Sequence, residues 1–384
     1  MTPKIPLARP DIGDDEIALV TETLRSGWIT QGPRVAEFER EFAAFVGAKH
    51  AVAVSSCTTA LHLSLVVLGV GAGDEVIVTP HSFIASANAV RYCGAWPVFV
   101  DINPTTLNMD PARVAAAITP RTKAIMVVHQ VGRPADLDAL AAIAKKHKLP
   151  LIEDAACAVG SEHHGRKIGH NHYSPLVCFS FHPRKVLSTG DGGMITTGDD
   201  EFARRLRMLR QHGMSVNDLA RHEATTIVTE EYTELGYNYR MTDVQAALGL
   251  AQLRRLPQLI ARRRELAACY DRELVSISQL ELFREPPESK WNYQTYLVRL
   301  KDATAAQRDA VMQRLLDAGI ATRRGIMSIH REPCYVDEFG EQSFPESERA
   351  SDQCLCLPLF SQMTDAEQQQ VMAALGKAIS SRAI

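Results

Sequence analysis

The feature that most constrains the fold is the alternation of β-rich runs and helical segments between residues 50 and 156. Short apolar and β-branched runs predict strands, and the segments between them have the apolar spacing of helices. The predicted strands span residues 50–56, 74–80, 96–102, 123–130 and 149–156, and the predicted helices span residues 58–69, 82–94, 111–119 and 135–148. This alternation indicates βαβ units, and therefore an α/β fold with a largely parallel sheet covered by helices on both faces.

The pattern changes after about residue 250. An Arg-rich helical run over 246–274 is followed by an alternating strand over 292–300, and then by helices over 305–319 and from Thr364. This order is typical of a smaller α+β unit. We therefore predict a large α/β domain over residues 1–250 and a small C-terminal α+β domain over residues 251–384.

Composition argues against several classes of protein. The net charge of −3 gives no global basic field for nucleic acid, and no run reaches the ~18 apolar residues of a membrane span. The N-terminal residues lack the pattern of a secretory signal. The eight cysteines form no CxxC pair and no Cys/His cluster with zinc-ligand spacing. We expect a cytoplasmic protein with reduced thiols and no metal site, which binds neither nucleic acid nor membrane.

A single lysine, Lys185, stands in the stretch "FSFHPRKVLSTGDGGM" between two predicted strands. It could be a loop lysine whose stem is covered and whose ammonium is hydrated. Alternatively, burial lowers its pKa and makes it a nucleophile that can form a Schiff base.

Other candidate residues lie where predicted strands end, which is where ligands bind in open α/β sheets. Ser56, Thr58 and Thr59 surround a helix start, where free N–H groups bind anions, although a plain N-cap has the same sequence. Asp154 either caps a turn or pairs with a protonated ring nitrogen. Phe83 is either a core residue or a stacking platform. With the lysine, these groups are what pyridoxal 5′-phosphate requires.

Motifs along almost the whole chain carry a family resemblance. They are "GWITQGPRVAEFEREFAAFVG", "SSCTTALHL", "DEVIVTPHSFIASANAV", "PVFVDI", "EDAACAVGS", "FSFHPRKVLSTGDGGMITT", "LGYNYRMTDVQAALGLAQL" and "CLPLF". The chain resembles the fold-type I pyridoxal-phosphate aminotransferases of nucleotide-linked keto sugars, the DegT–StrS family. The resemblance implies the fold-type I architecture and a homodimer with shared active sites.

The resemblance also implies roles for particular residues. Lys185 matches the Schiff-base lysine, Asp154 the partner of the pyridine nitrogen, and Phe83 the aromatic residue over the ring. Asn238, in "GYNYRM", matches an asparagine that reaches the phosphate from the partner subunit. The remaining cofactor-binding positions, mostly around the phosphate, fall on Cys57, Thr58, Thr59, Cys157 and Ser180.

Two of these positions depart from the family pattern. Cys57 replaces a common glycine, but the backbone N–H groups that would bind phosphate remain. Cys157 replaces a glutamine or histidine that could hydrogen-bond the cofactor's ring oxygen, and a thiol is a poor substitute. Cys157 is therefore either a binding residue or a small residue packed beside the ring.

The implied reaction moves an amino group from an amino acid, usually glutamate, to a keto sugar, with pyridoxal and pyridoxamine phosphate alternating and no metal. Cations for a nucleotide diphosphate could come from Arg184, Arg240, Arg323, Arg324 and His330. A keto-inositol acceptor and a non-catalytic sensor of sugar or cofactor remain alternatives. Related dehydratases carry histidine in place of the lysine, so Lys185 argues against that reaction.

Overall fold

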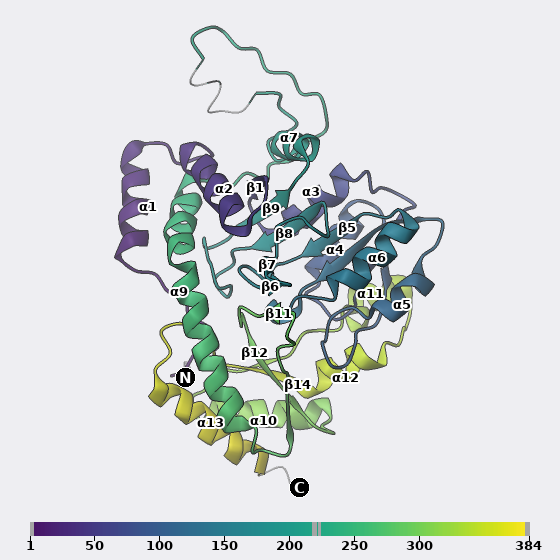
Figure 1. The fold of residues 1–384 in the computed structure, drawn as a ribbon, viewed down its shortest axis with the longest axis vertical. Helices are drawn as coiled ribbons and strands as arrows, with labels where there is room; N and C mark the ends of the chain where they lie inside the picture. Colours follow the sequence, from purple (N-terminus) through teal and green to yellow (C-terminus); the bar gives the residue numbers. More distant parts are fainter. Residues whose placement is uncertain (1–3, 217–220, 222–223, 381–384) are drawn as a thin grey trace.

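The computed structural model describes residues 4–216, 221 and 224–380. Its centre is a seven-stranded sheet in the order β1-β9-β8-β5-β4-β2-β3 (Figure 1). The strands are β1 (His50–Val54), β2 (Glu75–Val78), β3 (Trp96–Phe99), β4 (Thr122–Val128), β5 (Leu151–Asp154), β8 (Leu176–Ser180) and β9 (Gly193–Thr197). Only β9 runs against its neighbours in this sheet, and the other pairs are parallel. The predicted, largely parallel α/β sheet is confirmed.

Helices cover both faces of this sheet because alternate strand residues point to opposite sides. In β1, Ala51 and Ala53 join one core, whereas Val52 and Val54 join the other. The first core is shared with α2 (Pro33–Val46), α5 (Pro111–Ala117), α6 (Leu137–His147) and α9 (Asp243–Leu274). The second is shared with α3 (Cys57–Val67), α4 (Ala85–Tyr92) and α7 (Asp200–Leu209). Helix α1 (Asp14–Ser26) packs outside, against α9.

A second, antiparallel sheet has the order β10-β12-β14-β13. Its strands are β10 (Leu280–Leu282), β12 (Tyr296–Leu300), β13 (Arg323–Arg324) and β14 (Cys354–Leu357). Around it lie α10 (Ala305–Asp317), α12 (Pro345–Gln353) and α13 (Asp365–Ser380), whereas α11 (Pro333–Phe339) packs against β3 of the large sheet. A small third sheet joins β11 (Ser289–Lys290), β6 (Glu162–His163) and β7 (Arg166–Lys167). Two 3₁₀ turns span Gln130–Gly132 and Ile329–Arg331.

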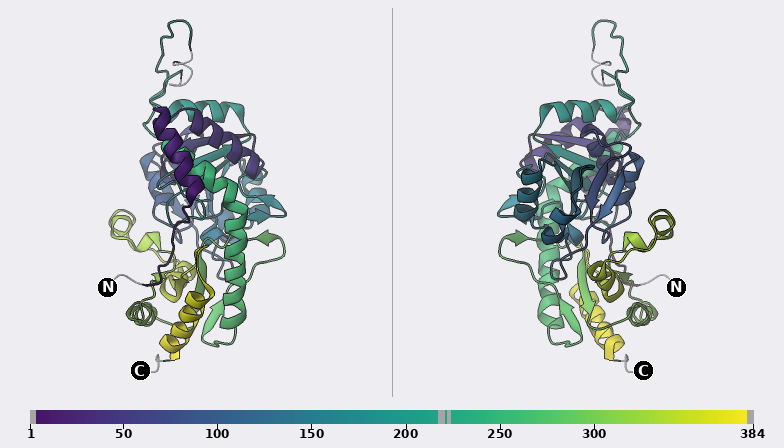
Figure 2. Two further views of the ribbon diagram at one scale, coloured as in Figure 1. Left: turned by 90° about the vertical axis from the view of Figure 1, so that its left-hand side faces the viewer. Right: turned by 90° about the vertical axis from the view of Figure 1, so that its right-hand side faces the viewer.

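Helix α9 runs without a break along both sheets (Figures 1 and 2). It begins at Asp243 because Thr242 and Gln245 form a reciprocal capping box. Its residues up to Leu259 pack in the core of the large sheet, and those from Leu266 onward pack in the core of the second sheet. The domain division at residue 250 stays a prediction.

We call the described residues 214–216 and 224–238, which lie between α7 and α9, the arm. Much of the arm projects away from the rest of the molecule in both figures. Ser215 N donates to Glu231 O at 2.9 Å, which pairs the two sides of the arm near its base. Large apolar side chains are exposed on it, including Ile227 at 98% and Leu235 at 88%. Among the described helices, none is both long and apolar enough to cross a bilayer.

Candidate active site

The carboxyl ends of the parallel strands meet at one edge of the large sheet, and a cavity of about 310 Å³ opens there. Loops after β1, β2, β4, β5 and β8 form its wall, and residues near β13 and β14 close it from the second sheet. Most of the residues predicted from the sequence meet in this cavity. These are Ser56, Cys57, Thr58, Phe83, Asp154, Cys157, Ser180 and Lys185.

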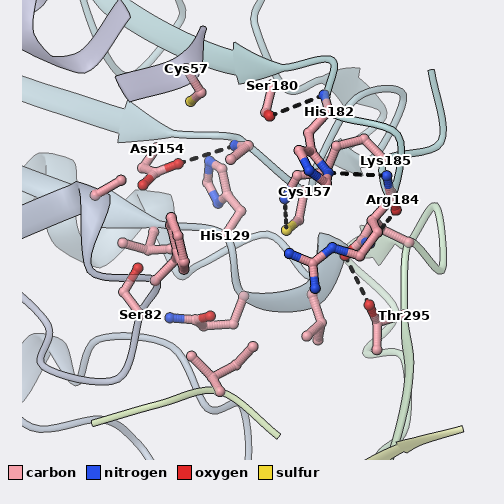
Figure 3. Close-up of a pocket in the computed structure, with 18 of the residues that line it drawn as sticks. Cys57, Ser82, His129, Asp154, Cys157, Ser180, His182, Arg184, Lys185 and Thr295 are labelled. Atoms are coloured by element: carbon pink, nitrogen blue, oxygen red, sulfur yellow. Dashed lines mark hydrogen bonds between the residues drawn. The ribbon is translucent and has the colours of Figure 1, made fainter. Parts of the chain in front are cut away.

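Lys185 lies in the loop between β8 and β9, as its sequence context predicts. Its Nζ donates a hydrogen bond to Cys157 Sγ at 3.1 Å (Figure 3). The loop leads into β9, whose first residue, Gly193, lies close to the start of α3. A Cβ at Gly193 would lie 2.5 Å from the carbonyl of Ser56, so a side chain there would displace the backbone.

The pKa of Lys185 is raised, contrary to the lowering expected from burial alone. Burial does lower this pKa, but the neighbouring groups, with Cys157 the largest contributor, raise it by more. Burial also raises the pKa of the Cys57 thiol well above its ordinary value, so this thiol stays neutral. Without other groups in the cavity, Lys185 is therefore an ammonium whose hydrogen-bond acceptor is sulfur.

Asp154 ends β5 with its carboxylate almost fully buried. Oδ1 accepts a hydrogen bond from Ala156 N at 3.1 Å, so the carboxylate does cap the following turn. Oδ2 accepts one from Ser86 Oγ at 2.7 Å, and Ser82 Oγ lies 2.8 Å from Ser86 Oγ. Donors to both oxygens fix the plane of the carboxylate.

The start of α3 presents backbone N–H groups to the cavity. Ser56 is the N-cap, and its Oγ accepts from Thr59 N at 3.2 Å. The N–H groups of Cys57 and Thr58 belong to the first helical turn and have no acceptor within the helix. Thr59 does not line the cavity, because its hydroxyl completes the capping box with Ser56. Helix starts of this kind bind phosphate.

Phe83 and Ser180 complete the predicted set within this chain. Phe83 lines the cavity with 56% of its surface exposed, so it is not a core residue. Ser180 ends β8, and its Oγ accepts from His182 N at 3.5 Å. Asn238 differs: it is exposed at the base of the arm and does not line the cavity of its own chain.

The sequence did not single out His129, which follows β4 at the same edge. Its Nδ1 accepts from Ala135 N at 3.0 Å, so its Nε2 carries the proton and donates to Glu153 at 2.9 Å. The ring is buried and fixed in this tautomer. His129 could have been identified from the sequence, because it stands at the end of a predicted strand in "VVHQ". No local signal marked Ser82, Ser86, Gln294 or Thr295, which also line the cavity.

Two of the five candidate cations line the cavity, namely Arg184 and Arg323. Arg324 and His330 do not, and both are paired elsewhere. Arg324 lies 3.5 Å from Glu332, and His330 Nε2 lies 3.1 Å from Glu348 Oε1. Arg240 is likewise outside the cavity wall.

These groups fit pyridoxal phosphate. The cavity combines an amine, a buried carboxylate with fixed orientation, an exposed aromatic face and a helix start. This is the set of partners that the cofactor's aldehyde, ring nitrogen, ring face and phosphate require.

Comparisons with known proteins agree with this chemistry. The sequence profile of the DegT/DnrJ/EryC1/StrS aminotransferase family matches residues 10–376. The spore coat polysaccharide biosynthesis protein SpsC of Bacillus subtilis is 42% identical over 375 residues, which cover 97% of this chain and 96% of SpsC. Among solved structures, the aminotransferase TlmJ of Streptoalloteichus hindustanus superposes with a TM-score of 0.90 at 38% identity, over 98% of this chain and 99% of TlmJ.

A sugar aminotransferase of Streptococcus pneumoniae, Spr1654, has been solved in pyridoxal- and pyridoxamine-phosphate forms. Both superpose with a TM-score of 0.93 at 30% identity, over 99% of this chain and 100% of that chain. The fold is therefore fold-type I and the cofactor is pyridoxal phosphate. This chain belongs to the DegT/DnrJ/EryC1/StrS family of pyridoxal-phosphate-dependent sugar aminotransferases.

Proposed function

We propose that this sugar aminotransferase takes its amino group from L-glutamate and transfers it to the keto group of a nucleotide-linked sugar. The observation that carries the acceptor is the presence of Arg184 and Arg323 in the wall of the cavity that holds Lys185. A guanidinium group can donate to two phosphate oxygens at once and stays positively charged, which suits the binding of a diphosphate. A keto-inositol has no phosphate for these arginines to bind.

The chain's residues would divide the work as follows. The bound cofactor supplies an electron sink for the carbanion. Lys185 would move the proton between the substrate carbon and the cofactor as general base and acid. Asp154, held by Ser86 and Ala156, would keep the ring nitrogen protonated. The reaction would consist of two half-reactions, one with the amino donor and one with the keto acceptor, which predicts ping-pong kinetics.

The remaining residues would hold the cofactor. The first turn of α3 at Cys57 and Thr58, together with Ser180, would bind its phosphate, and Phe83 would stack on its ring. Cys157 would lie beside the ring, where its contact with Lys185 Nζ favours the packing role over binding of the ring oxygen.

The acceptor is tested by offering glutamate with a panel of nucleotide-linked keto sugars and one keto-inositol, and by detecting the aminated product by mass spectrometry. Amination of a nucleotide-linked sugar is expected. Exclusive amination of the keto-inositol would show that it, and not a nucleotide-linked sugar, is the acceptor.

A pair of neighbouring variants sharpens this test. Arg323→Ala should raise KM for the nucleotide-linked sugar by about tenfold, because a contact to phosphate is lost. Arg324→Ala is the matched control, since Arg324 is exposed and lies outside the cavity wall. If both variants change KM equally, Arg323 does not bind the sugar nucleotide.

We also propose a homodimer in which Asn238 reaches the phosphate in the partner's cavity. This arrangement is supported by the exposure of Asn238, by its position outside its own cavity wall and by the exposed apolar residues of the arm. Sedimentation of the purified enzyme as a monomer at assay concentration would contradict it.

We place the enzyme in the cytoplasm. All eight cysteines are free thiols in the structure, as a reducing compartment would keep them. Recovery of the native enzyme in a secreted or membrane fraction would contradict this placement.

A further inference from the structure

A cluster of metal-binding side chains lies outside the cavity wall. Asp138 is in the first turn of α6, and His163 and His164 are in the β6–β7 hairpin. His163 Nε2 lies 3.0 Å from Asp138 Oδ2, and His164 Nε2 lies 2.9 Å from the same oxygen. Two imidazole nitrogens thus converge on one carboxylate oxygen, and all three potential ligand atoms lie within 4.8 Å of one another.

The carboxylate of Asp138 is oriented by a further residue. Tyr173 donates its hydroxyl proton to Oδ1 at 2.8 Å, so Oδ2 is the oxygen that faces both histidines. Metal-binding carboxylates are usually held in this way by an outer hydrogen bond, which fixes the direction of the free oxygen.

The hairpin holds both histidines in place. His163 is buried and pairs with Ser289 of β11, and His164 N donates to Glu288 O at 2.7 Å. His164 and Gly165 form the two-residue turn, with φ of 48° and 72°. Such turns require positive φ at both central residues, and histidine adopts this conformation more readily than most residues. The turn therefore brings two adjacent histidines to the same carboxylate.

We propose that Asp138, His163 and His164 bind a divalent transition-metal ion, with zinc as the type ion. Two imidazole nitrogens and one carboxylate oxygen are a common zinc ligand set, and the fourth position would be left to water. The acid alone could accept two N–H hydrogen bonds from neutral histidines. The same three atoms converge closely enough to coordinate one cation together.

The proposed role of the ion is to join two segments of the fold. Helix α6 covers the large sheet, while β6 pairs with β11, from which the chain continues to Gln294 and Thr295 in the cavity wall. A bound ion would fasten α6 to this hairpin and so stabilise that part of the wall. The ligands come from segments 25 or 26 residues apart in the chain, so no short zinc-ligand spacing marks them in the sequence.

The test measures zinc binding to the cofactor-loaded enzyme after treatment with EDTA and removal of the chelator, by competition with a chromophoric chelator. We expect the wild type to bind one zinc ion per chain at this site. His164→Asn should weaken this binding at least tenfold, since asparagine also accepts the left-handed backbone and only the imidazole is lost. Asp138→Asn is a second variant, which keeps the size of the side chain and removes its charge.

His50→Asn is the matched control. His50 Nε2 lies 2.6 Å from Asp200 Oδ1, but this pair has no second histidine. Zinc should raise the melting temperature of the wild type and of His50→Asn, but not that of His164→Asn or Asp138→Asn. Absence of a zinc site in the wild type, or equal zinc affinity in the wild type and in both cluster variants, would overturn the proposal.

Discussion

The edge of the large sheet and the arm differ in which side chains they bury and which they expose. At the sheet edge, polar groups are buried and paired, as the hydrogen bonds to both oxygens of Asp154 show. On the arm, apolar side chains such as Ile227 and Leu235 are exposed, and Asn238 is outside its own cavity. The comparison teaches that a single chain supplies the amine and the buried carboxylate of the cavity, whereas Asn238 and the exposed apolar residues of the arm have no place in the cavity of their own chain.

The largest effect is expected for Lys185→Ala, which removes the amine at the sheet edge. Turnover should be abolished, because no other described lysine lines the cavity to replace the amine. Borohydride treatment followed by peptide mapping should attach the cofactor to Lys185 in the wild type and to no residue in the variant. Lys49→Ala, which removes an exposed lysine paired with Asp200, is the control and should keep full activity. A cofactor label on another lysine would contradict the assignment.

Asp154→Asn tests the buried carboxylate. The fold should remain, but kcat should fall by more than tenfold, or about 1.4 kcal/mol of barrier, because a neutral amide cannot keep the ring nitrogen protonated. Ser86→Ala, which removes only one donor to Oδ2, should lower kcat less. The order of the two effects is decisive: if Ser86→Ala costs as much as Asp154→Asn, the carboxylate is only a structural cap.

The arm is tested with hybrid dimers. Mixing inactive Lys185→Ala with an Asn238→Ala variant already shown to be inactive should restore up to about a quarter of wild-type activity, since one site in each hybrid has both residues. Activity should return only if the two residues act across the interface. Failure to complement, with hybrid formation shown by mass spectrometry, would leave the arm without its proposed role.

The smallest expected effect concerns Cys157. In cofactor-free enzyme, Cys157→Ala should lower the apparent pKa of Lys185, because burial still disfavours the ammonium while its sulfur acceptor is gone. The pH dependence of acylation of Lys185, followed by mass spectrometry, gives this pKa. Cys334→Ala, at an exposed position, is the control. An unchanged or higher pKa would show that Cys157 does not govern the charge of the lysine.

The sequence was most informative where strands end. Each parallel strand places its carboxyl end at the same edge, so Thr58, Phe83 and Asp154 could be grouped from the order of predicted strands. Ser180 was expected only from the family resemblance. The helix predicted over 82–94 in fact begins at Ala85. The residues before it form a turn instead, and this turn places Phe83 in the cavity.

Contacts between distant segments could not be predicted in this way. Ser86 lies 68 residues before Asp154, and its hydroxyl reaches the carboxylate only because the start of α4 and the end of β5 meet at the cavity. The upward shift of the pKa of Lys185 depends on the sulfur of Cys157, 28 residues away. Periodicity describes which face a residue takes within its own element, but not which residue of another element it meets.

The continuous helix α9 has a consequence for how the molecule unfolds. Leu256 and Leu259 anchor it in one core, and Leu266 and Tyr270 anchor it in the other. If the part of α9 in one core unfolds, apolar side chains in the neighbouring turns become exposed. Unfolding of one part of the helix therefore destabilises the other core. Denaturation should therefore be a single cooperative transition, and a fragment cut at residue 250 would leave the large sheet without several of its core leucines.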